Sequence, residues 1–131
     1  MTTAMATIGL PDFDEPRLAE AVERLPPDAL DALPFGAIRL DAEGVVRLFS
    51  QTERHLSGYR EEALGRPFFP EIAPCMDIAS FRGRIECALA AGRLDLAFDH
   101  IGDFDDRTKE LRVRVQSASG GGCWIFMQRE T

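Results

Sequence analysis

The sequence has few of the features that mark extracellular, membrane-spanning or metal-binding proteins. Its three cysteines, Cys75, Cys87 and Cys123, are odd in number and include no CxxC pair, so neither a disulfide framework nor a zinc site is indicated. No segment approaches the roughly 18 consecutive apolar residues of a membrane-spanning helix. The first residues carry no basic group, unlike a signal peptide. We therefore expect a cytoplasmic protein that does not bind a membrane.

An excess of positive charge is also absent. The 15 basic side chains are outnumbered by 22 acidic ones, which gives a net charge of −7. Because the acidic side chains are spread along the chain, nucleic-acid phosphate would be repelled on average. We expect no nucleic-acid partner.

The apolar content is sufficient for one compact domain. At 131 residues and 45% hydrophobic content, a chain should bury roughly two-thirds of its unfolded surface. Residues 1–11 lack periodicity, whereas residues 16–25 show helical spacing and residues 27–33 form a second helical turn bounded by prolines. We expect an N-terminal cap over residues 1–34 and a core over residues 35–131.

The first half of the core predicts a hairpin followed by short helices. Strands are expected over residues 35–40 and 45–49, joined by a loop that ends in Gly44. The helix over residues 51–58 has Ser50 as its N-cap and Gly58 as its stop. Residues 60–65 predict one more helical turn.

The second half predicts a longer helix and three strands. Asp77 or Ser80 can cap a helix that runs to Gly92, with Phe81, Ile85, Ala88 and Leu89 on its inner face. Strands follow over residues 94–99, 111–116 and 123–128. The fold class is therefore α+β: a five-stranded antiparallel sheet with short helices gathered on one side and an N-terminal helical cap.

One sulfur stands in unusual surroundings. Cys75 lies in the stretch Pro67-Phe68-Phe69-Pro70-Glu71-Ile72-Ala73-Pro74-Cys75-Met76-Asp77, where prolines stiffen the backbone. A free cysteine is ordinarily a small core residue. The alternative is a fixed point of covalent attachment, because a thioester needs a sulfur that is held still and kept away from water.

Two sets of motifs stand out in the sequence. The first consists of Ser50, Glu53, Leu56-Ser57-Gly58-Tyr59 and Gly65-Arg66-Pro67-Phe68-Phe69, and it resembles the motifs of PAS sensor domains. The second consists of residues 33–41, residues 68–77 and Trp124-Ile125-Phe126 ending at Arg129, and it is similar more narrowly to the photoactive yellow protein family. Its most specific element is Ala73-Pro74-Cys75-x-Asp77.

The resemblance implies a blue-light photoreceptor with a 4-hydroxycinnamic acid (p-coumaric acid) chromophore, bound to Cys75 as a thioester. Light would isomerise its double bond, Glu53 would give a proton to the phenolate, and the N-terminal cap would loosen. Ser57 corresponds to the family's hydroxyl residue, and the gating arginine corresponds to Tyr59 or Arg60. The other implied chromophore contacts are Phe49, Ile38, Phe68, Ile72, Ala73, Pro74 and Phe104.

Glu53 can also be judged from its own surroundings. A carboxyl on a helix with apolar neighbours one turn away, little water and few donors favours its protonated form, which can donate a hydrogen bond and later a proton. The alternative is a solvated helix carboxylate. The resemblance favours the buried donor.

Two departures from the family pattern carry expectations. Phe49 stands where the family has a tyrosine that donates to the phenolate oxygen. Loss of such a donor costs about 1.5–3 kcal/mol and raises the pKa of the phenol, so we expect mixed protonation of the chromophore unless Ser57 replaces the donor. In the loop from Phe104 to Arg107, Asp106 falls where the family has a methionine, and we expect slow dark recovery.

Other functions remain to be weighed. The chain could be a PAS sensor for another ligand, or a dimerisation module with none. His55 and His100 could in principle bind haem, but a lone histidine beside charged residues is usually at the surface. A Cys75–His55–Glu53 hydrolase is disfavoured, because Glu53 and His55 are two apart on a helix and face different ways; we expect no enzyme.

The sequence includes no output domain. We therefore expect a monomer or weak homodimer that signals to a separate downstream protein by changing its surface. The cap over residues 1–34 is the expected moving part, since it is short, locally helical and interrupted by prolines.

Overall fold

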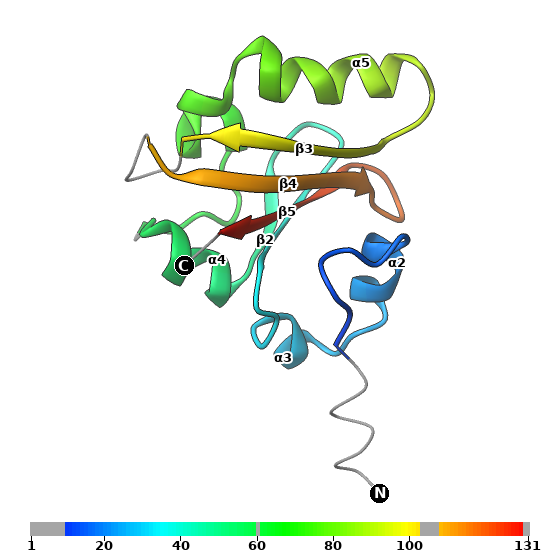
Figure 1. The fold of residues 1–131 in the computed structure, drawn as a ribbon, viewed down its shortest axis with the longest axis vertical. Helices are drawn as coiled ribbons and strands as arrows, with labels where there is room; N and C mark the ends of the chain where they lie inside the picture. The colour runs from blue at the N-terminus through cyan, green and yellow to red at the C-terminus, as the bar shows by residue number, and fades with distance from the viewer. Residues whose placement is uncertain (1–9, 60, 103–107, 130–131) are drawn as a thin grey trace, which may run out of the picture.

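The structure is a computed structural model of the chain, and it describes residues 10–59, 61–102 and 108–129. One antiparallel sheet contains β1 (Gly36–Leu40), β2 (Val46–Phe49), β3 (Asp95–Ile101), β4 (Glu110–Ser117) and β5 (Cys123–Arg129). The strand order is β2-β1-β5-β4-β3, which brings the first and last strands together in the middle of the sheet (Figure 1). The five expected strands are confirmed.

Hydrogen bonds and a glycine stabilise the sharp reversal of the chain between β1 and β2. The Asp41 carboxylate accepts hydrogen bonds from the backbone N–H groups of Glu43 (2.9 Å) and Val45 (3.0 Å). Gly44 has a φ of +83°, in the left-handed region that suits glycine. The register of the hairpin places Ile38 opposite Phe49.

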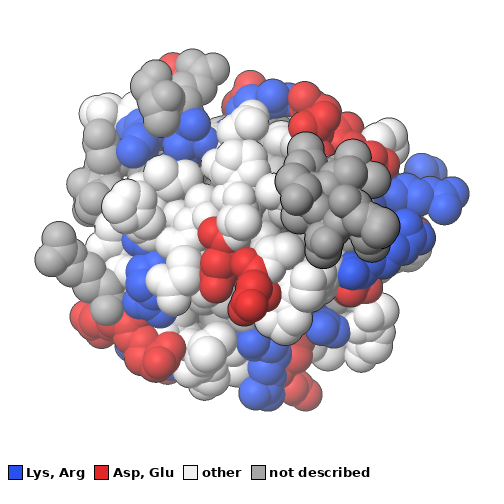
Figure 2. Space-filling view, turned by 90° about the horizontal axis from the view of Figure 1, so that it is seen from below, with Lys and Arg blue, Asp and Glu red and all other residues white. Residues whose placement is uncertain are grey.

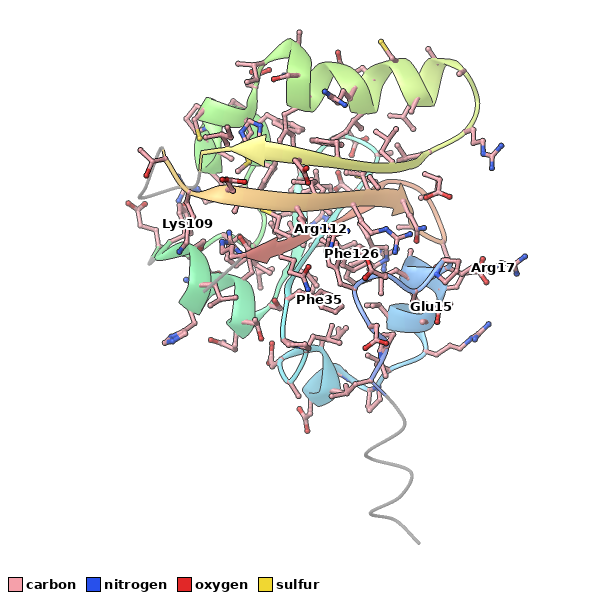
Figure 3. All side chains as sticks on the ribbon, viewed as in Figure 1. Glu15, Arg17, Phe35, Lys109, Arg112 and Phe126 are labelled. Carbon is pink, nitrogen blue, oxygen red and sulfur yellow. The ribbon has the colours of Figure 1, made fainter. Side chains whose placement is uncertain are left out.

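The two faces of the sheet bury different clusters, because successive side chains of a strand point to opposite faces. On one face, Ile38, Val113, Ile125 and Met127 pack with the helical segments between β2 and β3. On the other face, Ala37, Trp124 and Phe126 pack with the N-terminal cap. Phe35 and Phe126 lie next to each other beneath this cap, with ring centroids 6.0 Å apart (Figure 3).

The cap consists of α2 (Leu18–Glu23) and α3 (Pro27–Leu30). The helical segments on the opposite face are α4 (Gln51–Ser57), η1 (Phe68–Ile72), η2 (Pro74–Met76), η3 (Ala79–Gly83) and α5 (Arg84–Ala90). Figure 1 shows α5 and the cap at opposite ends of the view. The helical segments between β2 and β3 therefore gather on one side of the sheet as expected, and the cap covers the opposite face.

Two helical expectations need correction. Residues 61–65 form bends and a turn without a helix. The longer helix begins as the π-helical turn η3 after Ile78, and neither Asp77 nor Ser80 caps it with a side-chain hydrogen bond. Phe81 and Ile85 are buried as expected, but Leu89 is 56% exposed because the helix ends beyond the edge of the core.

On the face seen from below, acidic and basic side chains are scattered among uncharged ones, with acidic atoms near the middle of the view (Figure 2). In the described part of the chain, no helix is long and apolar enough to cross a bilayer. The same residues contain no group of three or more metal-ligating side chains.

Candidate functional site

Cys75 lies on η2, a single 3₁₀ turn that Pro74 begins. The turn is closed by hydrogen bonds from the Met76 N–H to Ala73 O (2.9 Å) and from the Asp77 N–H to Pro74 O (3.1 Å). Ala73 and Met76 are completely buried, so they anchor both sides of the cysteine in the core. The backbone around Cys75 is therefore fixed, as the prolines predict.

The Cys75 side chain itself is exposed. The expectation of a sulfur kept away from water is wrong for the chain without a ligand. A 3₁₀ turn has three residues per turn, so with Ala73 and Met76 directed inward, Pro74 and Cys75 are left facing outward. An incoming acyl donor can reach such a thiol.

The other two cysteines differ from Cys75 in chemistry or position. Cys123 is buried in the core, and burial raises the pKa of its thiol to about 12. It therefore stays protonated and is a poor nucleophile. Cys87 is exposed on α5, outside the proline-bounded turn.

Helix α4 places Glu53 in the core. The Ser50 side chain caps the helix by accepting a hydrogen bond from the Glu53 N–H (3.1 Å), and Gly58 ends it in the left-handed conformation. The Ser50 hydroxyl also accepts from the Ala37 N–H (3.1 Å) on β1, which fixes the helix to the sheet. Glu53 is 0% exposed, so the expected burial is confirmed and the solvated carboxylate is excluded.

The partner of Glu53 is Arg129 at the end of β5. The guanidinium donates two hydrogen bonds to the carboxylate, from Nη1 to Oε1 and from Nη2 to Oε2, both at 2.9 Å. The Arg129 side chain is only 1% exposed. A bidentate guanidinium pair favours the ionised carboxylate, so the expectation that Glu53 has few donors is wrong.

Gly36 provides the space that the Glu53 carboxylate occupies. A Cβ atom at this position of β1 would overlap Oε1 of Glu53. A glycine at the first residue of β1 therefore allows the buried ion pair to form against the backbone.

Phe49 lies among aromatic and cationic groups near this pair. Its ring is 5.8 Å from that of Tyr59, centroid to centroid, and the Arg54 guanidinium lies 5.5 Å over its face. The Tyr59 hydroxyl accepts a hydrogen bond from Nη1 of Arg66 (3.1 Å). Phe49 has no hydroxyl, so it contributes a surface without a hydrogen-bond donor.

Ser57 is buried one turn after Glu53 on the same helix. Its hydroxyl oxygen accepts a hydrogen bond from the Tyr59 N–H (3.1 Å). Whether it also replaces the donor lost at Phe49 stays a prediction.

Most apolar residues of the predicted site belong to one buried cluster. Besides Phe49, it includes four of the expected contacts: Ile38, Phe68, Ile72 and Ala73. Pro74 is exposed beside Cys75. Arg60 and Phe104 lie outside the described residues, as does the loop on which slow dark recovery depends.

A hollow of about 290 Å³ opens elsewhere, between the β1–β2 loop and α5. Its lining includes Leu40, Phe69, Ile85, Leu89 and Cys123, and none of the expected chromophore contacts. It is therefore not the predicted site.

The two histidines have ordinary surroundings. His55 is exposed on α4. His100 packs its ring edge-on against Phe81, with centroids 5.0 Å apart, and partial burial together with Arg84 lowers its pKa below the usual value.

Arg129 is the functional candidate that the sequence reasoning missed. A signal for it exists in β5, where Cys123, Ile125 and Met127 alternate into the core and Arg129 continues the same alternation. A basic residue at a core-facing position requires buried hydrogen-bond acceptors, and a buried carboxylate is one way to supply them.

By their chemistry, the predicted site residues supply the groups that an aromatic acyl ligand with a phenol end requires. They combine an accessible thiol on a rigid turn, a buried carboxylate, a buried hydroxyl and an apolar wall. A thiol forms a thioester, while carboxyl and hydroxyl groups can exchange hydrogen bonds with a phenol oxygen.

A family model described as the PAS fold matches residues 26–130. The chain is 31% identical over 119 residues to the photoactive yellow protein of Rhodothalassium salexigens, covering 89% of this chain and 95% of that protein. It is 32% identical over 102 residues to the photoactive yellow protein of Halochromatium salexigens, covering 76% and 82% respectively.

Solved structures agree with these sequence relatives. The photoactive yellow protein domain of the sensor histidine kinase Ppr from Rhodospirillum centenum is similar with a TM-score of 0.76 and 36% identity, covering 85% of this chain and 99% of that one. A PAS domain from Colwellia psychrerythraea, at 16% identity and a TM-score of 0.59 over 79% of this chain and 92% of that one, shares the fold.

Proposed function

Because the chain belongs to the photoactive yellow protein family of PAS domains, we propose that it is a cytoplasmic blue-light photoreceptor carrying 4-hydroxycinnamic acid on Cys75. Photoactive yellow proteins are sensors and not enzymes, so the hydrolase alternative is abandoned. The observation that carries the proposal is the accessible Cys75 thiol on a turn whose neighbours Ala73 and Met76 are anchored in the core.

In this proposal Cys75 is the attachment point. Its thiolate attacks the carbonyl carbon of an activated 4-hydroxycinnamate, a sulfur–carbon bond forms, and the activating group leaves with the bonding electrons. The thiol proton goes to solvent, which the exposed side chain contacts. When bound, the group supplies absorption of light and trans–cis isomerisation of its double bond.

The remaining residues surround the 4-hydroxycinnamoyl group and provide its proton donor. Ile38, Phe68, Ile72 and Ala73 provide the apolar wall that excludes water. Glu53, when protonated, is the proton donor of the photocycle, and its burial makes any change of its charge costly to the surrounding core. That cost is the proposed origin of the loosening of the N-terminal cap, which signals to a separate downstream protein.

Coexpression with an enzyme that activates 4-hydroxycinnamate, followed by intact mass measurement, tests the proposal. We expect a mass gain of one 4-hydroxycinnamoyl group, lost in Cys75→Ala. Cys87→Ala is the matched control, because Cys87 is also exposed but lies on α5. An adduct that persists in Cys75→Ala, or no adduct at all, would contradict the proposal.

A PAS sensor that does not respond to light is the second candidate. Phe49 favours it, since the ring offers no donor to a buried phenolate. This candidate predicts no adduct under the same conditions.

A further inference from the structure

The charge of Glu53 is set by a residue from the opposite end of the core sequence. Arg129 reaches Glu53 across 76 positions of sequence and binds both carboxylate oxygens at 2.9 Å. Both side chains are essentially removed from water, at 1% and 0% exposure. Two opposite charges in such a place stabilise each other strongly, and neither is easily neutralised alone.

We propose that Arg129 is a positioning residue that holds Glu53 as a carboxylate in the ligand-free protein and in a share of the loaded molecules, so that Glu53 in that share accepts a hydrogen bond from the bound ligand. This inference rests on the proposed function. In that share of the molecules Glu53 accepts a hydrogen bond instead of donating a proton, because a carboxylate has no proton to donate.

The immediate surroundings support this assignment. Gly36 leaves space for Oε1 of Glu53, so the backbone of β1 accommodates the carboxylate in its paired position. Met127, two residues before Arg129 on the same face, places its sulfur 3.8 Å from Nη2 of the guanidinium. Ser50 fixes the start of the Glu53 helix to β1, so the carboxylate and the guanidinium come from elements tied to the same strand.

In the loaded protein, one proton can reside either on the phenol of the bound group or on the Glu53 carboxyl. With Glu53 ionised, the phenol end of a 4-hydroxycinnamoyl group keeps its proton, because a phenolate facing a carboxylate is repelled. With Glu53 protonated, the carboxyl donates a hydrogen bond to the phenolate. Phe49 adds no donor that would favour the phenolate, so Arg129 determines the ratio of the two forms.

The first experiment needs no bound ligand. Glu53 is the one buried acidic residue in the part of the chain that the structure describes. Infrared spectroscopy of the ligand-free protein labelled with ¹³C-glutamate at pH 7 should show no carboxylic-acid C=O band that shifts with the label. A label-sensitive band that disappears in Glu53→Gln would overturn the proposal.

Two variants complete the test. Arg129→Gln removes the cation, so a label-sensitive acid band should appear, whereas Arg129→Lys retains the charge and should show none. In protein loaded on Cys75, Arg129→Gln should raise the ratio of visible to near-ultraviolet absorbance roughly tenfold, the change produced by one pKa unit. Arg129→Lys should stay close to the unmodified protein, which separates the effect of charge from that of packing.

An unchanged ratio in loaded Arg129→Gln, or an acid band in Arg129→Lys, would contradict the proposal. Failure of the proposed function is distinguishable, because it appears as a missing mass adduct on Cys75. The infrared measurement on ligand-free protein then still decides whether Arg129 holds Glu53 as a carboxylate.

Discussion

The two faces of the sheet hold buried arginines in different ways. On the face of the predicted site, Arg129 pairs with one carboxylate, that of Glu53. On the cap face, the Arg114 guanidinium donates to three backbone carbonyls, those of Phe13 (2.8 Å), Glu15 (2.6 Å) and Pro16 (3.2 Å). The first arrangement joins one charge with one charge, whereas the second combines three neutral carbonyls at short range with one half-exposed carboxylate, that of Asp95, 4.0 Å from Nη2 of Arg114.

The difference indicates how each face would respond to a single proton. Protonation of Glu53 would remove the charge that Arg129 pairs with, so on this face one proton transfer changes the whole interaction. Among the described residues the cap is held at several points, since Gln116 and Trp124 add further hydrogen bonds to it. Loosening the cap therefore requires several weaker contacts to break together.

Breaking the charged pair should have the largest effect. Glu53→Ala leaves the Arg129 guanidinium buried without its carboxylate, and we expect a loss of about 3–5 kcal/mol in the free energy of unfolding. Urea denaturation measures this loss. The double variant Glu53→Met/Arg129→Met should recover most of it, and a loss below about 1 kcal/mol in the single variant would show that the pair does not control this face.

Removing the cation of the cap face should cost less. Arg114→Met abolishes the hydrogen bonds to the carbonyls of the cap, with an expected loss of about 1.5–3 kcal/mol. Hydrogen exchange should show faster opening of α2 than of β5. The control is Arg112→Met, which removes an ion pair between a half-exposed Arg112 and an exposed Asp14. Its loss should lower the free energy of unfolding by no more than about 0.5 kcal/mol. Equal acceleration in α2 and β5 would argue against a separately attached cap.

Filling the space beside the Glu53 carboxylate perturbs the buried ion pair without removing a charge. Gly36→Ala places a methyl group where Oε1 of Glu53 lies, and we expect a loss of about 1–3 kcal/mol from overpacking. Gly83→Ala is the control, because its nearest neighbour would be at 3.5 Å, an ordinary contact. Thermal unfolding measures the melting temperatures of both variants. Similar decreases in the two would rule out a special role for Gly36.

Lowering the pH should have the smallest effect on stability, and it should act on the cap face. Partial burial acts to raise the pKa of Glu23, but hydrogen bonds from the Trp124 indole (2.8 Å) and the Ser119 N–H (3.0 Å) outweigh it, so the pKa is held below its usual value. A lowered pKa contributes stability that is present above the unfolded pKa and is lost as the pH falls through the folded one. Tryptophan fluorescence should report this loosening in acid, and Glu23→Gln should reduce its dependence on pH.

Local patterns in the sequence predicted most of the fold. Apolar runs and alternating apolar residues predicted all five strands, and Ser50 and Gly58 predicted the bounds of α4, because these signals depend on neighbours in sequence. The side of the sheet that the cap covers was not predictable in this way. It depends on long-range contacts such as the hydrogen bond from the Ala19 N–H to Gln116.

The candidate site was predicted in part for the same reason. Burial of Glu53 was predicted from the family resemblance, because its helix alone left a solvated carboxylate open, and its pairing with Arg129 joins residues 76 apart and needed the three-dimensional fold. The outward direction of Cys75 depends on how η2 lies over the core, which the prolines around it do not specify.

Flash spectroscopy of protein coexpressed with activated 4-hydroxycinnamate tests the central claim, a light-sensitive ligand on Cys75, most directly. The proposal predicts an absorbance change after a flash covering the near-ultraviolet and blue, followed by recovery in the dark over repeated cycles. Cys87→Ala should behave in the same way, and Cys75→Ala should show no change. A loaded protein whose spectrum is unaffected by light, or a light response that persists in Cys75→Ala, would contradict it.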